Sequence, residues 1–188
     1  VLVEHLGDGI NSAYSDFGLY RRSDTLYYSS LRFTFRKDSL APRREITKIL
    51  RQDTAGNLLA ALPDYINPLG RLAAHTAFSA DGQSVYFTLC DYVGNAADIR
   101  CEIYRSPVNS QGQWGKPERL PLNDSNSTNT HPNVGQDPAS GKPFLYFSSD
   151  RAGGQGGLDL YRSELLANGA CGPAENLTAF NTARNDAT

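Results

Sequence analysis

The chain has 188 residues, including 17 glycines, 10 prolines, 10 tyrosines and 8 phenylalanines, and is long enough for one domain with a hydrophobic core. Its formal net charge of −2 and the lack of a lysine- and arginine-rich cluster argue against a nucleic-acid partner. No apolar run approaches the roughly 18 residues of a membrane-spanning helix, and neither a signal peptide nor any methionine is present, so we expect a mature or excised, soluble segment of something longer.

Short aromatic-rich runs separated by Gly, Pro, Asn, Asp and Ser indicate an all-β protein. In chain order, YYSS at 27–30 returns as YFTL at 86–89 and as YFSS at 146–149. The period is about 55 to 60 residues, and each period holds four short strand candidates. In the middle copy, Asp81-Gly82 supplies the positive φ that a tight hairpin turn needs. Four antiparallel strands per repeat predict the blades of a β-propeller.

The predicted blades span 16–62, 75–122 and 131–178, and the whole chain is a single β-propeller domain or part of one. Residues 1–6 resemble the last strand of a preceding blade, and residues 180–188 resemble the lead-in to a following blade. Propellers generally close with four or more blades. We therefore expect a fragment of a larger ring, although a partner could also supply the missing blades.

Two cysteines flank a predicted hairpin. Cys90 closes one strand-like run and Cys101 opens the next. A disulfide between them would indicate an oxidising compartment. The alternative is a pair of buried thiols that act as small hydrophobic side chains.

The glycine-dense loop from Asp150 to Asp159 places two carboxylates around four glycines. One interpretation is a calcium or partner site, because carboxylates and carbonyls suit a hard cation. The other is a structural hairpin connection in which Asp150 and Asp159 accept backbone N–H bonds and Arg151 pairs with a carboxylate. The spacing does not match an EF-hand, so we predict neither a metal nor a cofactor.

Four polar side chains fall at one repeat position in this alignment, just before the presumed innermost strand: Asp16, His75, His131 and Asp186. In a propeller they would form a ring near one mouth of the central channel. Such a ring could bind a ligand, a metal or a peptide end. Alternatively, each side chain forms hydrogen bonds within its own blade or to the next one.

The single tryptophan, Trp114, stands where the other copies have Leu58 and Cys171. This set of residues predicts apolar packing between blades. A platform that stacks on a sugar ring is the alternative.

Three segments carry a resemblance to a known family: SADGQSVYF at 79–87, GQWGKP at 112–117 and LYFSSDRAGGQGGLDLYRS at 145–163. They resemble the TolB-like, WD-type propeller repeat. More narrowly, SSDRAGGQGGLDLY looks like the blade signature of Bacteroidetes OmpA-family outer-membrane-associated proteins, such as the PorE-like component of the type IX secretion system. This resemblance implies a periplasmic, outer-membrane-associated scaffold that binds proteins, with any contact to peptidoglycan made through domains outside this chain.

The sequence contains no G-x-S-x-G elbow, no paired metal-binding cysteines and histidines, and no phosphate-binding loop. We therefore predict a non-enzymatic protein-binding scaffold. Loops 32–44, 91–99 and 150–158 would present a rigid binding surface at one face of the blades. The first loop differs most between copies, which marks it as the partner-specific contact. Its cations are Arg36, Lys37, Arg43 and Arg44.

Two other functions stay open. The propeller could be the gating domain of a serine peptidase whose catalytic domain lies outside this chain. It could also bind carbohydrate or peptidoglycan itself, in which case exposed aromatic side chains should line its channel or loops.

Overall fold

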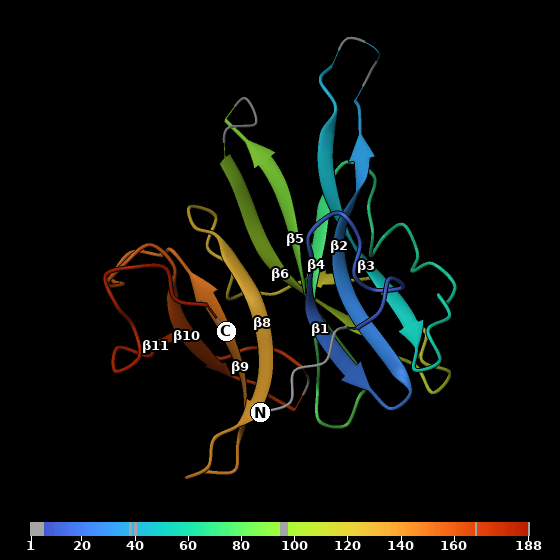
Figure 1. Ribbon diagram of the computed structural model, residues 1–188. Coiled ribbons are helices and arrows are strands. Elements are labelled where there is room, and N and C mark those ends of the chain that lie inside the picture. The colour runs from blue at the N-terminus through green and yellow to red at the C-terminus, as the bar shows by residue number, and fades with distance from the viewer. Residues whose placement is uncertain (1–5, 38, 40, 95–97, 168, 188) are drawn as a thin grey trace.

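The computed structural model describes residues 6–37, 39, 41–94, 98–167 and 169–187, and within them the chain is all-β (Figure 1). Its strands are β1 (Asp16–Arg22), β2 (Thr25–Phe35), β3 (Arg44–Asp53), β4 (Leu72–Phe78), β5 (Ser84–Val93), β6 (Asp98–Pro107), β7 (Glu118–Arg119), β8 (Asn129–Gln136), β9 (Pro143–Ser149), β10 (Asp159–Glu164) and β11 (Glu175–Asn176). None of the described segments forms a helix that could span a bilayer.

The strands form three antiparallel sheets with the orders β1-β2-β3, β4-β5-β6-β7 and β8-β9-β10-β11. Strand β4 contacts β1 of the preceding sheet and β8 of the following sheet. The first strand of each sheet is therefore its innermost strand, and the sheets are consecutive blades of a β-propeller (Figure 1). The predicted architecture of about three antiparallel blades is confirmed.

The first blade has three strands instead of the predicted four. Its outer segment meets β3 at a single bridge between Gln52 and Leu58. Beyond that bridge, Pro63 occupies the place that Arg119 takes in β7 of the second blade. The chain turns at this point, where the N–H groups of Ile66 and Asn67 donate to the Pro63 carbonyl at 2.8 and 3.0 Å, so the segment leaves the sheet instead of pairing further with β3.

Two hydrophobic cores lie between adjacent blades, because side chains alternate between the two faces of each strand. Trp114 is central to the core between the first and second blades and is 3% exposed. Its ring lies 5.7 Å from that of Tyr27 and 5.8 Å from that of Phe78, measured between centroids. The second core joins the second and third blades and contains Tyr86, Ile103, Leu120, Leu122, Leu145, Phe147, Tyr161 and Leu165. The second blade is thus covered on both faces.

Trp114 confirms one prediction and excludes its alternative. The bridges Gln52–Leu58, Val108–Trp114 and Leu165–Cys171 show that Leu58, Trp114 and Cys171 are equivalent. Burial of the indole in the inter-blade core confirms apolar packing. A ring that is 3% exposed offers no face for stacking on a sugar.

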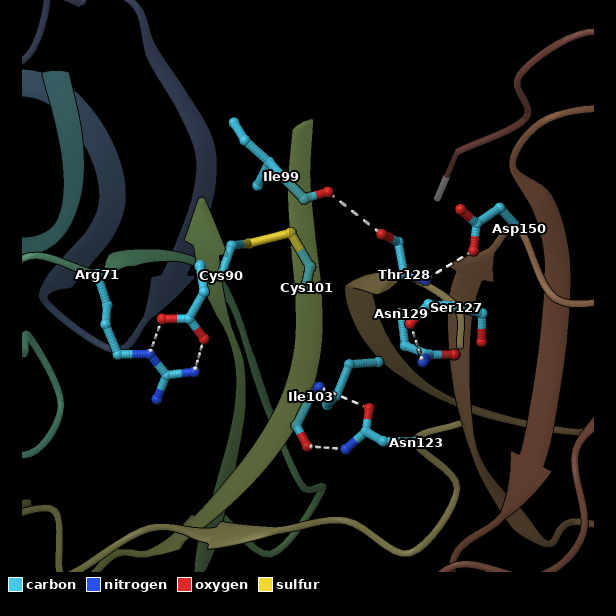
Figure 2. The surroundings of a disulfide bond; sticks show 11 residues. Arg71, Cys90, Ile99, Cys101, Ile103, Asn123, Ser127, Thr128, Asn129 and Asp150 are labelled. Carbon is cyan, nitrogen blue, oxygen red and sulfur yellow. Dashed lines mark hydrogen bonds and ion pairs between the residues drawn. A yellow bond between two sulfur atoms is a disulfide. The ribbon is translucent and has the colours of Figure 1, made fainter. Parts of the chain in front are cut away.

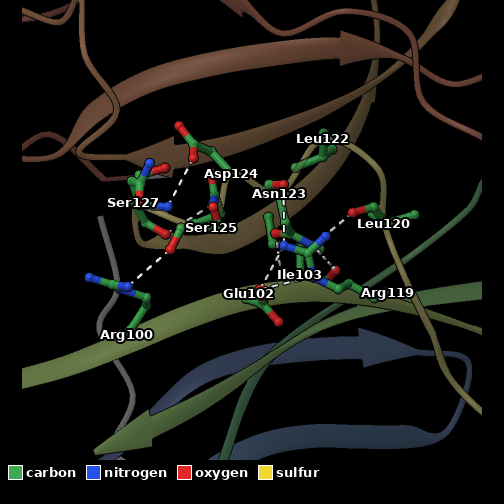
Figure 3. Close-up of polar contacts among 12 residues, drawn as sticks. Arg100, Glu102, Ile103, Arg119, Leu120, Leu122, Asn123, Asp124, Ser125 and Ser127 are labelled. Carbon is green, nitrogen blue, oxygen red and sulfur yellow. Dashed lines mark hydrogen bonds and ion pairs between the residues drawn. The ribbon is translucent and has the colours of Figure 1, made fainter. Parts of the chain in front are cut away.

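A buried asparagine closes the outer edge of each blade. Asn123 accepts the N–H of Ile103 at 2.8 Å and donates to the carbonyl of the same residue at 2.7 Å (Figure 3). Its side chain thereby replaces a strand partner and satisfies both backbone groups. The same pair of bonds joins Asn67 to Ile49 and Asn181 to Leu160. We call Asn67, Asn123 and Asn181 the exit asparagines, because each follows the last strand of its blade.

Candidate functional site

Two long hairpins project from the same end of the molecule (Figure 1). Strands β2 and β3 stay paired up to Phe35 and Arg44, and β5 and β6 stay paired up to Val93 and Asp98. Strands therefore occupy 32–35 and 44 of the first predicted loop, and 91–93 and 98–99 of the second, so the loops begin farther along each hairpin than predicted. Residues 38, 40 and 95–97 lie outside the described part of the chain. We call these projecting parts of the two hairpins the hairpin end.

A third, smaller core holds the two hairpins together. It contains Ile46, Leu72, Cys90 and Cys101, with Phe33, Phe35 and Tyr92 packed against it. Cys90 and Cys101 lie directly opposite each other in β5 and β6 and form a disulfide (Figure 2). The predicted disulfide is confirmed. It crosses the hairpin at the level of the third core and restrains both strands.

Polar contacts add to this support. The hydroxyl of Tyr92 donates to the carbonyl of Glu45 at 2.7 Å, and the Arg44 guanidinium lies 5.1 Å from the Tyr92 ring centroid. At the base of the hairpin formed by β5 and β6, Arg71 donates twice to the Asp91 carboxylate, at 2.9 and 2.7 Å (Figure 2). Sequence analysis did not identify Tyr92, Arg71 or Asp91 as functional. The alternating Phe33-Thr34-Phe35 pattern was the available signal that the first hairpin extends beyond the sheet.

The predicted basic residues divide into two groups. Arg36, Lys37 and Arg43 are exposed at the tip of the first hairpin. Arg44 is half-buried against Tyr92 and supports the hairpin. Three of the four predicted cations are therefore available at the surface of the hairpin end.

Asp16 lies in a hydrogen-bonded network at the same end of the first blade. Its carboxylate accepts the N–H of Ser12 at 2.7 Å, the hydroxyl of Ser12 at 2.6 Å and the guanidinium of Arg32 at 2.9 Å. Burial alone would raise the pKa of Asp16, but bonds from Ser12, Ser30 and Arg32 outweigh it and lower the pKa to about 2. Asp16 is thus an ionised, fully occupied acceptor.

Arg151 occupies in the third blade the place of Arg32 in the first. Its Nε donates to Ser149 at 3.0 Å, and its Nη2 donates to the Leu122 carbonyl at 3.1 Å and to the side-chain oxygen of Asn129 at 2.5 Å. The expected pairing of Arg151 with a carboxylate is wrong, because Asn129 stands where the first blade has Asp16. Burial lowers the pKa of Arg151.

The two aspartates of the glycine loop accept backbone N–H groups, as the structural interpretation predicted. Asp150 accepts the N–H of Thr128 at 2.6 Å (Figure 2). Asp159 is buried and accepts the N–H groups of Gln155, at 3.0 Å, and Gly156, at 3.2 Å. Over the described ranges, no group of three or more His, Cys, Asp or Glu side chains is arranged to hold a metal ion.

The four residues expected to form a channel ring do not share one repeat position. The two histidines are equivalent to each other, and the two aspartates resemble each other in their hydrogen bonds. His75 and His131 are equivalent: both have left-handed backbone, with φ of 52° and 51°, at a bulge in the innermost strand. Their rings lie 3.8 Å apart. Gly18, with φ of 63°, takes this position in the first blade. The predicted equivalence with Asp16 is wrong by two residues, because the connections between blades differ in length.

Asp186 belongs with Asp16 instead of with the histidines. Its carboxylate accepts the N–H of Thr182 at 2.7 Å, as Asp16 accepts that of Ser12. The two aspartates therefore organise similar turns, one before β1 and one at residues 182–186, whereas the histidines lie within β4 and β8.

The two adjacent histidine rings predict a loss of stability in mild acid. Burial and the neighbouring His131 lower the pKa of His75 from its ordinary 6.5 to about 3, and burial lowers that of His131. As the pH falls below 6.5, these histidines take up protons in the unfolded chain before they do so in the folded chain. Their contribution to the free energy of unfolding is therefore fully present above pH 6.5 and is lost as the pH falls towards 3. We expect the free energy of unfolding to fall by about 2–3 kcal/mol between pH 7 and pH 4, as measured by urea titration at each pH.

Variants at the two histidines test the cause of this acid sensitivity. Glycine accepts left-handed backbone, as Gly18 shows in the first blade, so His75→Gly combined with His131→Gly retains the bulge. Most of the slope between pH 6.5 and pH 4 should disappear in that double variant. An unchanged slope would assign the acid sensitivity to other groups.

Comparisons with known proteins do not place the chain in a family. No family model and no curated protein matches it in sequence. The endo-arabinase from Bacteroides thetaiotaomicron VPI-5482 is a structural neighbour with 18% identity and a TM-score of 0.49, covering 85% of this chain and 60% of that one. Puromycin hydrolase is another, with 11% identity and a TM-score of 0.45, covering 90% of this chain and 33% of that one. The chain thus spans less than two thirds of either enzyme, and likeness at this level says nothing about activity.

Proposed function

We propose that this chain is a non-enzymatic binding scaffold whose hairpin end contacts an acidic surface of a partner protein. The observation that carries the proposal is the third core, in which the disulfide and three aromatic side chains join two hairpins beyond the sheets. Blade packing does not require strands of this length, since the corresponding hairpin of the third blade ends at Ser149 and Asp159. A reinforced projection with exposed cations suits recognition by surface complementarity.

The charge of the hairpin tip defines the kind of partner. Residues 36–45 contain four cationic and two acidic side chains. Arg36, Lys37 and Arg43 extend into solvent, where they can steer an acidic surface towards the tip and pair with it. The aromatic side chains beneath them pack the strands of the two hairpins together, and a supported hairpin loses less entropy on binding.

The disulfide supports an oxidising location for this scaffold. We therefore place it in the periplasm, associated with the outer membrane, which is the location implied by the blade signature of the third repeat. A component of the type IX secretion machinery is the specific form of this proposal.

Charge reversal at the hairpin tip tests the proposal. A photo-crosslinking residue at Ser39, in the protein expressed in its parent cell, should yield a defined adduct with one acidic protein. We expect Arg36→Glu combined with Lys37→Glu and Arg43→Glu to reduce that adduct at least about tenfold, because three attractive contacts become repulsive.

Lys116 supplies the matched control, because it is an exposed lysine on the outer segment of the second blade. Lys116→Glu should leave the adduct unchanged. Both sets of variants should melt within a few degrees of the wild type, since surface substitutions change stability little. An adduct that survives the triple reversal would contradict the proposal.

A further inference from the structure

A groove of about 670 Å³ lies between the first and second blades, at the end of the molecule opposite the hairpin end. It is lined by Arg51 near the end of β3, by residues of the segment 60–65 and by the turn from Pro107 to Gly115. The groove lies where the outer segment of the first blade leaves the sheet after the Gln52–Leu58 bridge. Its volume suits a small organic ligand.

Arg51 is the one charged side chain in the wall of this groove, within the part of the chain that is described. Its Nη2 donates to the carbonyl of Ala60 at 2.7 Å. No carboxylate of the described residues lies within salt-bridge distance of Arg51, and its buried Nε makes no hydrogen bond to them. The groove therefore contains a half-buried arginine that has no salt-bridge partner among the described residues and that interacts with the neutral hydroxyl of Tyr27.

The second blade has an arginine at the same position, which also forms no salt bridge to the described residues but has a hydrogen-bond acceptor for its Nε. Arg105 is equivalent to Arg51, because it lies two residues after the strand residue that an exit asparagine binds. Its Nε donates to the hydroxyl of Ser84 at 2.9 Å. The pKa of Asp81 is lowered by bonds from Ser79 and Gln83 and, to a lesser extent, by the charge of Arg105. Arg105 thus has both a hydroxyl acceptor and a nearby carboxylate.

The rest of the groove is apolar or carries neutral polar groups. Tyr65 stands at the rim, 43% exposed, and its hydroxyl donates to the Trp114 carbonyl at 2.7 Å. This bond fixes the orientation of the ring. Leu62 and Val108 line the wall, and Asn109 and Gln113 add side-chain amides. A fixed aromatic ring beside an arginine with no salt bridge to the described residues suits a ligand that joins an apolar or ring-shaped body to an anionic group.

We propose that this groove binds a small organic carboxylate, with the carboxylate paired to Arg51 and an adjoining ring or apolar group against Tyr65. Two natural sources share this chemistry: the free carboxyl end of an acylated amino acid or peptide, and an acidic sugar. The site is distinct from the hairpin end and does not depend on the function proposed for it.

Binding of simple probes tests the proposal. Hippurate represents an acylated amino acid and glucuronate represents an acidic sugar, and hippuramide and glucose are their uncharged counterparts. By isothermal titration we expect at least one acid to bind with a Kd of about 1 mM, a value usual for ligands of this size. Its uncharged counterpart should bind at least about tenfold more weakly. Binding of hippurate alone, of glucuronate alone or of both supports the proposal and identifies the source.

Two variants locate the bound acid. Arg51→Gln should weaken its binding at least about tenfold, whereas Arg105→Gln, the matched control in the second blade, should leave the affinity within about twofold. Tyr65→Ala alters an exposed ring, so it tests the rim even if Arg51→Gln fails to fold, and it should weaken binding about fivefold. Three results would overturn the proposal. The first is that neither acid binds at about 10 mM, which is about ten times the expected Kd. The others are equal binding of an acid and its uncharged counterpart, and full affinity in the folded Arg51→Gln protein.

Discussion

Replacing Trp114 with alanine is expected to lower the free energy of unfolding by about 4 kcal/mol, the largest effect of any single change considered for this chain. The indole is 3% exposed and contacts aromatic rings from both neighbouring blades, among them Tyr27 and Phe87. Its removal leaves a cavity at the centre of the first inter-blade core, and the surrounding rings cannot close it without moving the blades. Urea unfolding followed by circular dichroism measures the loss, since Trp114 is the only tryptophan available for fluorescence.

Leu58 is the matched control for this substitution. It makes the equivalent bridge in the first blade, but it is 61% exposed. Leu58→Ala should therefore cost less than about 0.5 kcal/mol. Similar losses at the two positions would show that the bridge, and not burial of the indole, provides the stability.

The second large effect is expected at Asn123, where alanine should cost about 3 kcal/mol. The Asn123 side chain satisfies the N–H and the carbonyl of Ile103 and also donates to the carbonyl of Leu120 at 2.9 Å (Figure 3). Alanine leaves the N–H of Ile103 without a partner in a buried place, where water cannot replace the lost bond. The carbonyls of Ile103 and Leu120 keep the N–H groups of Leu120 and Asn123, at 3.1 and 3.2 Å, but lose their bonds to the amide. Urea unfolding gives the total cost, and amide exchange at Ile103 reports whether the blade edge has opened.

The same change at Asn181 should be less costly, at about 1 kcal/mol. Asn181 makes the equivalent bonds to Leu160, but Leu160 is half-buried whereas Ile103 is fully buried. Water can therefore reach the backbone groups of the third blade once the amide is removed. Equal costs at Asn123 and Asn181 would contradict this dependence on burial.

The architecture could be predicted from the sequence because the strand signals are local and repeat. The runs at 27–30, 86–89 and 146–149 all lie in the second strand of a blade, and the Asp81-Gly82 turn is formed as expected, with Gly82 at φ 69°. Aromatic and β-branched residues alternate with other residues along a strand because successive side chains point to opposite faces, and this alternation can be read from the sequence. The pairing of Cys90 with Cys101 could be predicted in the same way, because a hairpin between their two strands places these residues opposite each other.

The alignment of the innermost strands could not be predicted, because it depends on connections of unequal length. Asn11, Asn126 and Asn181 look equivalent in sequence, yet the residues that close the blades are Asn67, Asn123 and Asn181. A side chain that hydrogen-bonds to a distant strand leaves no periodic signal. An alignment based on the sequence therefore matches His75 and His131 with the aspartates, whereas the structure matches them with Gly18.

The candidate sites were only partly visible in the sequence. Exposure of Arg36, Lys37 and Arg43 agreed with the prediction, because charged residues at a turn remain in water. The support given by Tyr92 to the opposite hairpin, and the groove beside Arg51, could not be predicted. Both arise where two blades meet, and contacts between blades depend on tertiary packing that local patterns do not encode.

The two inter-blade cores also decide how the chain comes apart. Among the described strands, each blade contacts only its sequence neighbours, so the free energy of unfolding is approximately a sum of blade terms and interface terms, as in linear repeat proteins. The second blade contributes to both interfaces, whereas the first and third contribute to one each. Opening therefore begins at the outer blades, and the amides of β5 and β6 exchange only when both interfaces have separated.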